Sequence, residues 1–268
     1  METIQQSRID SVLKATALDE SITNCATFDL ANLKIKNVRS IEVPTNIRLG
    51  HLIENIVAQL FKASNVYDLL YHTTQIIVDK KTIGEIDFVI KNSRTHEIIH
   101  LEFAYKFYLF DPEFSAESPL NCWIGPNRND SLYEKLEKLK TKQFPLLFHP
   151  CTQQTLPNLV VNRVSQQLCL LASLYVPFDF KGPISNSYQK AIKGYYMNFE
   201  AFVKQHTSSK TYCLPSKKDW GIDPTDNKNW SEFTATKENI IKKLEEKQAA
   251  LCWQMDNGTA TQFFIIWW

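Results

Sequence analysis

Apolar side chains recur along the first part of the chain with spacings that predict its first elements. They follow helical spacing over about 47–63, which predicts an amphipathic helix that begins after the turn and N-cap of Pro44-Thr45-Asn46. A shorter helix is expected near 9–18. Residues 71–79 are expected to form a strand, and Lys80-Lys81-Thr82 should connect it tightly to the next strand.

A hairpin is expected next. Residues 83–90 alternate up to Asp87 and then become continuously apolar, as expected of a strand that enters a covered sheet, and Glu85 shares the face of Asp87. A polar turn over 91–96 leads to a second strand over 97–107. Because side chains alternate along a strand, one face of this second strand is apolar. Its other face carries His100, Glu102, Ala104 and Lys106.

The second half of the chain is expected to mix helices and strands. We expect a helix capped by Asn129 or Asp130 and ended by Pro145, a strand over 163–177, a helix over 188–202, a short strand over 211–214, a helix over 236–251 and a strand over 263–268. The last strand has no polar face, which predicts burial on both sides.

Composition excludes several classes of protein. Lys and Arg total 30 against 29 acidic residues, so any basic surface must be local. The six cysteines form no CxxC pair and no zinc spacing, which favours reduced thiols in a cytoplasmic protein. We expect no signal peptide, since residues 1–12 lack an apolar core, and the longest apolar stretch, near 168–178, is too short to span a bilayer. P-loop, GxSxG, HExxH and GxGxxG motifs do not occur in the sequence.

Several stretches resemble a known group of enzymes. A helix with Glu54, a strand with Asp87 in a GEID context, and a strand with Glu102 and a downstream lysine resemble the core of the PD-(D/E)XK nuclease superfamily. More narrowly, five stretches are similar to the bacterial family called domain of unknown function 1853, which is placed in that superfamily. They are LGHLIENIVAQLF, GEIDFVI, HLEFAYKFYLF, WIGPNRNDSLYEKLEKLKTKQFPLL and KKDWGIDP.

The resemblance covers nearly the whole chain and implies a fold. We expect an α/β protein with a central mixed β-sheet flanked by helices. A restriction-endonuclease-like core would occupy about 44–176, and a C-terminal elaboration would occupy 177–268. Both would belong to a single domain over 1–268.

The resemblance also implies a site. Asp87 and Glu102 would bind Mg²⁺ or Mn²⁺, Glu54 would be an ancillary carboxylate, and Gln143 would be a site residue on a helix. Phosphodiester hydrolysis needs a hard cation, which neutralises phosphate oxygens and lowers the pKa of a water, and one or two carboxylates can hold Mg²⁺ for this purpose.

One position departs from the superfamily motif, which places a lysine two residues after the glutamate. That position is Ala104, whereas Lys106 keeps the same strand face two residues further on. A lysine there can orient the water or stabilise developing charge, so Lys106 is the candidate catalytic lysine. The resemblance and this chemistry together indicate a metal-dependent nuclease that acts on nucleic acid; we expect DNA as the partner, although the sequence does not distinguish DNA from RNA.

Other interpretations stay open. The charged residues of the hairpin could form a solvated face, Glu54 could be an exposed helix glutamate, and Lys106 could form an ion pair with Asp87 or Glu85. His100 could join a transition-metal site but is more typical of a structural histidine.

Two alternatives concern nucleic acid more directly. Lys135, Lys138 and Lys142 could form a stripe for the phosphate backbone, although such helix faces are most often solvated. The whole protein could also be a non-catalytic module that binds nucleic acid or protein on a degenerate nuclease fold.

Overall fold

The computed structural model describes residues 2–35, 41–114 and 118–268, with side chains in the first range from Gln5 onward. The strands are β1 (Tyr67–Val78), β2 (Lys81–Asn92), β3 (Ile98–Phe110), β4 (Trp123–Ile124), β5 (Val164–Pro177), β6 (Ile192–Asn198), β7 (Lys210–Cys213), β8 (Ala250–Asp256) and β9 (Thr259–Ile266). The α-helices are α1 (Glu2–Leu13), α2 (Glu20–Thr23), α3 (Leu49–Lys62), α4 (Leu132–Lys138), α5 (Phe144–Leu146), α6 (Pro150–Thr155), α7 (Asn186–Gln189), α8 (Phe199–Gln205) and α9 (Phe233–Glu245). Short 3-10 turns are η1 (Leu30–Asn32), η2 (Pro119–Cys122), η4 (Val161–Arg163), η5 (Lys217–Asp219) and η6 (Pro224–Asp226), and η3 (Leu139–Gln143) is a π-helical turn.

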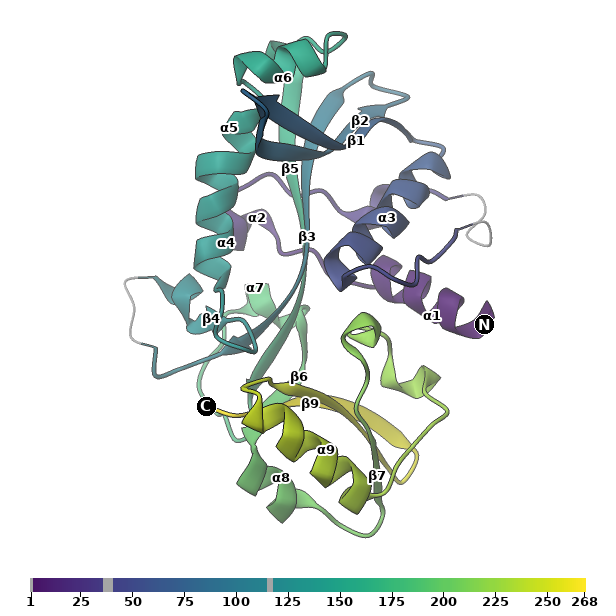
Figure 1. Cartoon of the computed structure of the whole chain (residues 1–268), viewed down its shortest axis with the longest axis vertical. Coiled ribbons are helices and arrows are strands. Elements are labelled where there is room, and N and C mark those ends of the chain that lie inside the picture. The colour runs from purple at the N-terminus through teal and green to yellow at the C-terminus, as the bar shows by residue number, and fades with distance from the viewer. Residues whose placement is uncertain (1, 36–40, 115–117) are drawn as a thin grey trace. The chain divides into compact units, whose positions relative to one another are not determined.

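These strands form one mixed sheet. Within the described residues it has nine strands in the order β1-β2-β3-β5-β6-β9-β8-β7, and β4 pairs with β3 (Figure 1). The β5–β6 and β6–β9 pairs are parallel, whereas the β1–β2, β2–β3 and β8–β9 pairs are antiparallel. The prediction of an α/β fold with a mixed sheet flanked by helices is therefore confirmed.

The chain divides into two compact units. Unit 1 comprises Met1–Lys106 and Lys135–Ala172, and unit 2 comprises Phe107–Glu134 and Ser173–Trp268. Strands β3 and β5 contribute residues to both units. The predicted core over 44–176 stays a prediction, as does the single domain over 1–268.

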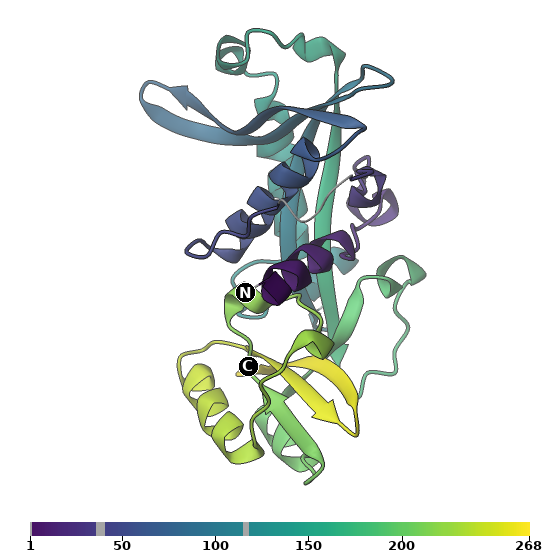
Figure 2. The ribbon, with the colours of Figure 1, turned by 90° about the vertical axis from the view of Figure 1, so that its right-hand side faces the viewer.

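In unit 1, β1 and β2 form a long hairpin, which Figure 2 shows as a twisted ribbon. Val78 pairs with Lys81, so the connection consists of Asp79 and Lys80, one residue earlier than predicted. Both have positive φ, at 48° and 63°. This is the geometry of a type I′ turn, whose twist matches that of the two strands.

Helix α3 buries the apolar stripe that its sequence predicts. Leu52, Ile53 and Ile56 are almost fully buried, and Phe61 packs against Phe88 of β2 with ring centroids 5.5 Å apart. The predicted cap in the Pro44–Asn46 turn is wrong: Arg48 is the N-cap residue and makes no side-chain capping bond. Burial of the stripe, rather than a cap, accounts for the position of this helix.

Helix α1 lies earlier than the helix predicted near 9–18. It ends at Leu13, with Ile9 and Val12 buried. Leu18 instead donates a 2.9 Å backbone hydrogen bond to Leu170 of β5. This pairing with a distant strand was not visible in the local pattern.

Helix α4 begins with a capping box, which differs from the predicted cap. Ser131 Oγ accepts from the N–H of Glu134, and Glu134 accepts from the N–H of Ser131, so neither Asn129 nor Asp130 is the cap. The helix continues through η3 into α5 and ends at Leu146 rather than at Pro145. Proline lacks an N–H and crowds the preceding turn, and the wider π-helical turn precedes it here.

In unit 2 the predicted helix over 188–202 is wrong, because β6 occupies residues 192–198 and α8 follows it. The backbone of β6 pairs in parallel with β5 and β9. A Cβ atom on Gly194 would lie 2.1 Å from the backbone oxygen of Gln262, so the strands approach closely at this glycine.

The predicted helix over 236–251 is also partly wrong. Helix α9 ends at Glu245, and the strand β8 begins at Ala250. Strand β9 is buried at Phe263, Phe264 and Ile265, as its apolar sequence predicts. Helices α8 and α9 pack against this part of the sheet through Phe202 and Ile240 (Figures 1 and 2).

Candidate functional site

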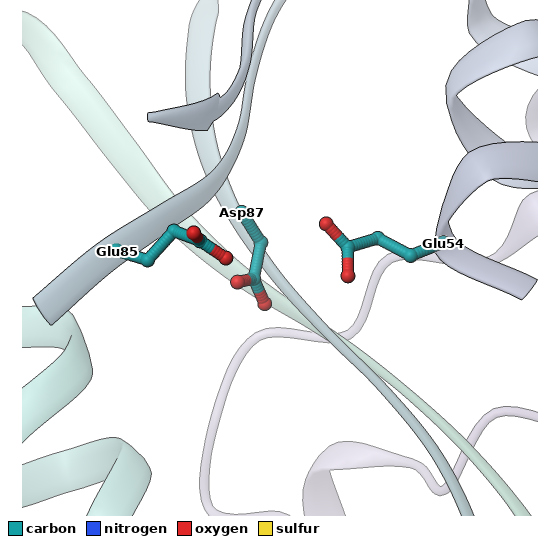
Figure 3. A group of neighbouring side chains, drawn as sticks. All are labelled: Glu54, Glu85 and Asp87. Atoms are coloured by element: carbon teal, nitrogen blue, oxygen red, sulfur yellow. The ribbon is translucent and has the colours of Figure 1, made fainter. Parts of the chain in front are cut away.

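Three carboxylates from two elements of unit 1 meet at one place. Glu54 lies on α3, and Glu85 and Asp87 lie two residues apart on β2, so both strand side chains share one face. One carboxylate oxygen of each residue lies within 4.8 Å of the corresponding oxygens of the other two, and all three residues are half-buried (Figure 3). We call Glu54, Glu85 and Asp87 the carboxylate cluster.

Helix α5 packs against the opposite face of β2. A Cβ atom on Gly84 would lie 2.7 Å from Cδ2 of Leu146, so the glycine of the GEID sequence lets the leucine approach the strand. Ile86, between the two acidic residues, is fully buried on the opposite face. The alternation predicted for this strand therefore orients Glu85 and Asp87 together.

Polar neighbours hold Glu54 in its charged form. Thr73 Oγ1 donates a 2.9 Å hydrogen bond to Glu54 Oε1, and His72 and His51 place ring nitrogens 3.4 and 3.5 Å from its oxygens. Burial raises the pKa of Glu54, but the contacts with His72 and Thr73 outweigh it, so the pKa is below its usual value. Glu54 is not the exposed helix glutamate of the alternative interpretation.

Asp87 and Glu102 lie together, as predicted. Burial and the charge of Glu102 raise the pKa of Asp87 well above its usual value, against the 2.9 Å hydrogen bond that Phe103 N–H donates to Asp87 Oδ2. Burial likewise raises the pKa of Glu102 to about 7, although Lys135 and a hydrogen bond with Asp87 oppose this rise. A buried pair of acids of this kind retains a proton near neutral pH in the absence of a cation.

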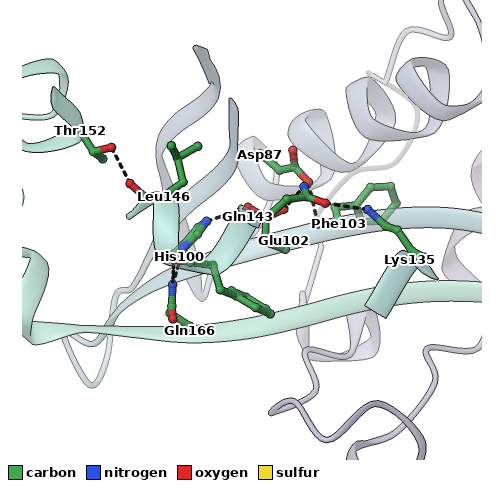
Figure 4. A network of polar contacts seen from close by, with 10 residues as sticks. Asp87, His100, Glu102, Phe103, Lys135, Gln143, Leu146, Thr152 and Gln166 are labelled. Atoms are coloured by element: carbon green, nitrogen blue, oxygen red, sulfur yellow. Dashed lines mark hydrogen bonds and ion pairs between the residues drawn. The ribbon is translucent and has the colours of Figure 1, made fainter. Parts of the chain in front are cut away.

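Hydrogen bonds fix both oxygens of Glu102, as Figure 4 shows. His100 Nε2 lies 2.9 Å from Oε1, and Gln143 Nε2 donates to Oε2. The amide of Gln166 donates to Nδ1 of His100 at 2.9 Å, so the proton of the neutral ring is on Nε2 and points to Glu102. Burial lowers the pKa of His100 to about 4, in agreement with a neutral ring. His100 is therefore a buried structural residue that orients Glu102.

Gln143 reaches Glu102 from the π-helical turn η3. Its Oε1 accepts a 3.0 Å hydrogen bond from Nζ of Lys135, which lies on α4. The amide thereby connects a lysine to a carboxylate. Gln143 thus lies where the resemblance implied, next to the acidic pair.

Lys135 is the basic residue that faces this acidic pair. Burial lowers its pKa, and the charges of Asp87 and Glu102 oppose the shift. Of the three lysines considered as a phosphate stripe, Lys138 and Lys142 are exposed, whereas Lys135 is half-buried. The interpretation of a uniformly solvated face is therefore wrong for Lys135.

A cavity of about 290 Å³ adjoins these groups in unit 1. Its charged lining residues are Arg48, Glu54, Lys106 and Lys135, and its wall includes Ala104. The charge of Lys106 lowers the pKa of Lys135 further, so the two ammonium groups lie near each other. The cavity thus has cationic walls next to the carboxylate cluster.

Two residues of this site, Glu85 and Lys135, are not among the candidate site residues predicted from the sequence. Glu85 was placed on the face of Asp87 but was not assigned a role, although the two-residue spacing was sufficient to place it. Lys135 was noted only as part of a charged helix, because helical periodicity does not reveal what packs against each face.

The fold and the site together define an α/β protein with a mixed sheet and a carboxylate cluster beside a half-buried lysine. The chain belongs to the family described as a domain of unknown function (DUF1853), which it matches over residues 5–262. Comparison with curated proteins gave no match, and comparison with solved structures gave none. Across the part of the chain that the structure describes, no helix is long and apolar enough to cross a membrane.

Proposed function

We propose that this protein is a metal-dependent nuclease that hydrolyses phosphodiester bonds in DNA. The observation that carries the proposal is the position of Lys135 beside Asp87 and Glu102, next to a carboxylate cluster and a cationic cavity. These groups correspond in kind to what a phosphodiesterase needs: oxygen ligands for a hard cation, a lysine near them and positive charge for phosphate.

The residues fit a Mg²⁺ or Mn²⁺ ion. Both ions prefer oxygen ligands, and the cluster of Glu54, Glu85 and Asp87 offers three carboxylates with oxygens within 4.8 Å of one another. Burial raises the pKa of Glu102 to about 7 and the pKa of Asp87 well above its usual value, so the pair loses its protons readily only when a cation takes their place. A divalent cation would neutralise the negative charge of the carboxylates and activate a water for attack on phosphorus.

Side chains of this site would hold the cation and orient its ligands. Asp87 would be a metal ligand, with Glu54, Glu85 or Glu102 as the further carboxylates. His100 and Gln143 keep the oxygens of Glu102 oriented through their hydrogen bonds. Such outer contacts tune ligand geometry and basicity.

Lys135 supplies the ammonium group that the strand lacks. Ala104 occupies the motif position of the PD-(D/E)XK superfamily and is buried at the cavity wall. We infer that a lysine on α4 serves in place of one on β3, and that the restriction-endonuclease-like core is retained in this altered form. Arg48 and Lys106 on the same cavity would bind the phosphates on either side of the scissile bond.

The test is cleavage by the purified protein. Single-stranded DNA, double-stranded DNA and RNA would be incubated with Mg²⁺ or Mn²⁺, and with EDTA as the control. We expect metal-dependent cleavage of DNA that is lost in Asp87→Asn and kept in Asp68→Asn, an exposed aspartate on β1. If the folded wild type cuts no substrate with either metal, the proposal is wrong, and binding of the same substrates would favour the non-catalytic module.

A further inference from the structure

Unit 2 contains a second, larger cavity, of about 670 Å³. Sites for small molecules usually have volumes of about 300–1,000 Å³, so this cavity could enclose a ligand of nucleotide size. It lies where the loop around Arg128, the segment that starts at Pro215 and the end of α9 meet. Two of the sequence stretches noted above, WIGPNRND and KKDWGIDP, contribute to it.

The charges around this cavity are unbalanced. Its lining contains the four cations Arg128, Lys217, Lys243 and Lys247 and a single carboxylate, that of Glu246. Among the described residues, none of the three lysines forms an ion pair. Charged side chains of one sign that converge on a cavity concentrate ligands of the opposite sign.

Aromatic rings hold several of these cations in place. Lys217 Nζ lies 5.5 Å from the ring centroid of Trp220, and Lys247 Nζ lies 5.8 Å from that of Trp267. Arg128 is fixed between Asp111, at 3.3 Å, and the ring of Trp268, at 4.5 Å. These contacts orient the cations before any ligand arrives, which lowers the entropy lost on binding.

Hydrogen bonds between side chains and backbone groups also fix the loop that carries Arg128. Asn127 Oδ1 accepts a 2.8 Å hydrogen bond from the N–H of Ala249, just before β8. Trp268 Nε1 donates a 3.1 Å hydrogen bond to the carbonyl of Pro126. The cavity wall is therefore tied together by residues from distant parts of the sequence.

We propose that this cavity binds a nucleoside triphosphate. The phosphates would contact Arg128, Lys217 and Lys243, and the base would pack against the indole of Trp267, which lines the cavity. Charge-assisted hydrogen bonds from several cations are the usual means of holding a polyphosphate, and indole faces suit a base. The proposal does not rest on the nuclease activity, because all of these residues belong to unit 2.

The test is calorimetric titration of the whole protein with ATP in EDTA, so that the carboxylate cluster contributes no metal. We expect ATP to bind, and inorganic triphosphate, which lacks the base, to bind at least about tenfold more weakly. Trp267→Leu should weaken ATP binding without changing the affinity for triphosphate. Equal affinity for ATP and triphosphate, or no binding of ATP, would overturn the proposal.

Neighbouring lysines provide matched controls for charge. Lys217→Gln and Lys243→Gln should each weaken ATP binding by about tenfold, the effect of losing one charge-assisted contact. Lys218→Gln and Lys242→Gln remove the same charge from residues that do not line the cavity and should leave the affinity unchanged. An equal loss of ATP affinity in all four variants would mean that the lysines attract ATP only through the overall positive charge of this surface, and would overturn the proposal.

Lys243 lies in the last turn of α9, so a structural role for this residue has to be separated from ATP binding. Lysines near the C-terminus of a helix stabilise its dipole, so Lys243→Gln could lower the melting temperature through α9 alone. Melting temperatures of the four variants therefore accompany the titrations. Loss of stability in Lys243→Gln with unchanged ATP binding would contradict the proposal.

Discussion

Lys135 Nζ donates a 3.0 Å hydrogen bond to Gln143 Oε1, and Gln143 in turn donates to Glu102. This relationship places a helix-borne ammonium group at the acidic pair. Lys135→Ala should retain metal binding and lose cleavage by on the order of 10²-fold, as expected when one preorganised charge is removed from a transition state. Lys138→Ala is the control, because Lys138 is an exposed lysine on the same helix. Full activity in folded Lys135→Ala would remove this residue from the chemistry.

Lys106 should behave differently from Lys135. It lines the cavity with Arg48, and we propose that it binds substrate phosphate there. Lys106→Ala should therefore raise KM several-fold and leave kcat nearly unchanged, since it removes binding that is equal in the ground and transition states. Steady-state kinetics on one DNA substrate would measure both constants. A fall in kcat as large as that in Lys135→Ala would instead make Lys106 the catalytic lysine.

Gln143 should act as a positioning residue. Gln143→Leu removes the donor to Glu102 and the acceptor for Lys135 while it keeps a side chain of similar size. We expect weaker Mn²⁺ binding by about 10-fold, in line with the loss of an outer contact to a metal ligand. Gln143→Glu keeps the acceptor, loses the donor and adds a negative charge beside Glu102. It should therefore raise the pH required for binding, a change that a merely structural role for Gln143 would not produce.

The acidic pair predicts a dependence of stability on pH. Folding raises the pKa of Glu102 from 4.5 to about 7, so the folded state binds more protons than the unfolded chain between these values. Its contribution to stability is present below about pH 4.5 and is lost as the pH rises toward 7. The unfolding free energy of Glu102→Gln, measured relative to that of the wild type in EDTA, should therefore increase by about 1–3 kcal/mol as the pH rises from 5 to 7.

His100 contributes in the opposite sense, because burial lowers its pKa from 6.5 to about 4. The unfolded chain then binds the extra proton, so this contribution to stability grows as the pH rises between these values. Both proteins retain His100, so the difference between wild type and Glu102→Gln reports the coupled titration of Glu102 and Asp87. Urea denaturation at several pH values would measure this difference. A difference that does not change with pH would contradict the raised pKa of Glu102.

Local patterns were sufficient for some parts of this structure. The helical spacing of Leu52, Ile53 and Ile56 predicts α3, and the alternation around Asp87 predicts which side chains share a face. Both patterns reflect burial against a neighbouring layer, which a single segment records in its own sequence. The approach of Glu54, Gln143 and Asp87 within unit 1 followed from the resemblance rather than from these patterns.

Other parts depend on pairing between distant segments. Strand β6 contains a Gly-Tyr-Tyr sequence with no clear alternation, and it is a strand because β5 and β9 pair with it. The charged sequence before β8 favours a helix, so the boundary near Glu245 was missed. For Lys135, the helix pattern is the same whether the side chain meets water or a carboxylate.

The close approach of β6 and β9 gives a test of the fold in unit 2. Gly194→Ala places a methyl group against the backbone oxygen of Gln262, which can move only if the strand moves. We expect a loss of about 1–3 kcal/mol in unfolding free energy, as for overpacking of a core. Gly50→Ala, on α3, meets nothing within 4 Å and should be neutral or slightly stabilising. Equal stability of the two variants in urea would show that the strands do not approach so closely.

We propose that the acidic residues around Asp87 hold a divalent cation, and calorimetric titration with Mn²⁺ measures this binding. The wild type should bind Mn²⁺ and release protons, because the raised pKa values of Asp87 and Glu102 mean that the pair retains a proton until the cation displaces it. Affinity should increase as the pH rises from about 6 to 8. Asp87→Asn should abolish binding, and Asp68→Asn should not change it. Binding of Mn²⁺ with unchanged affinity to a folded Asp87→Asn variant would contradict the account.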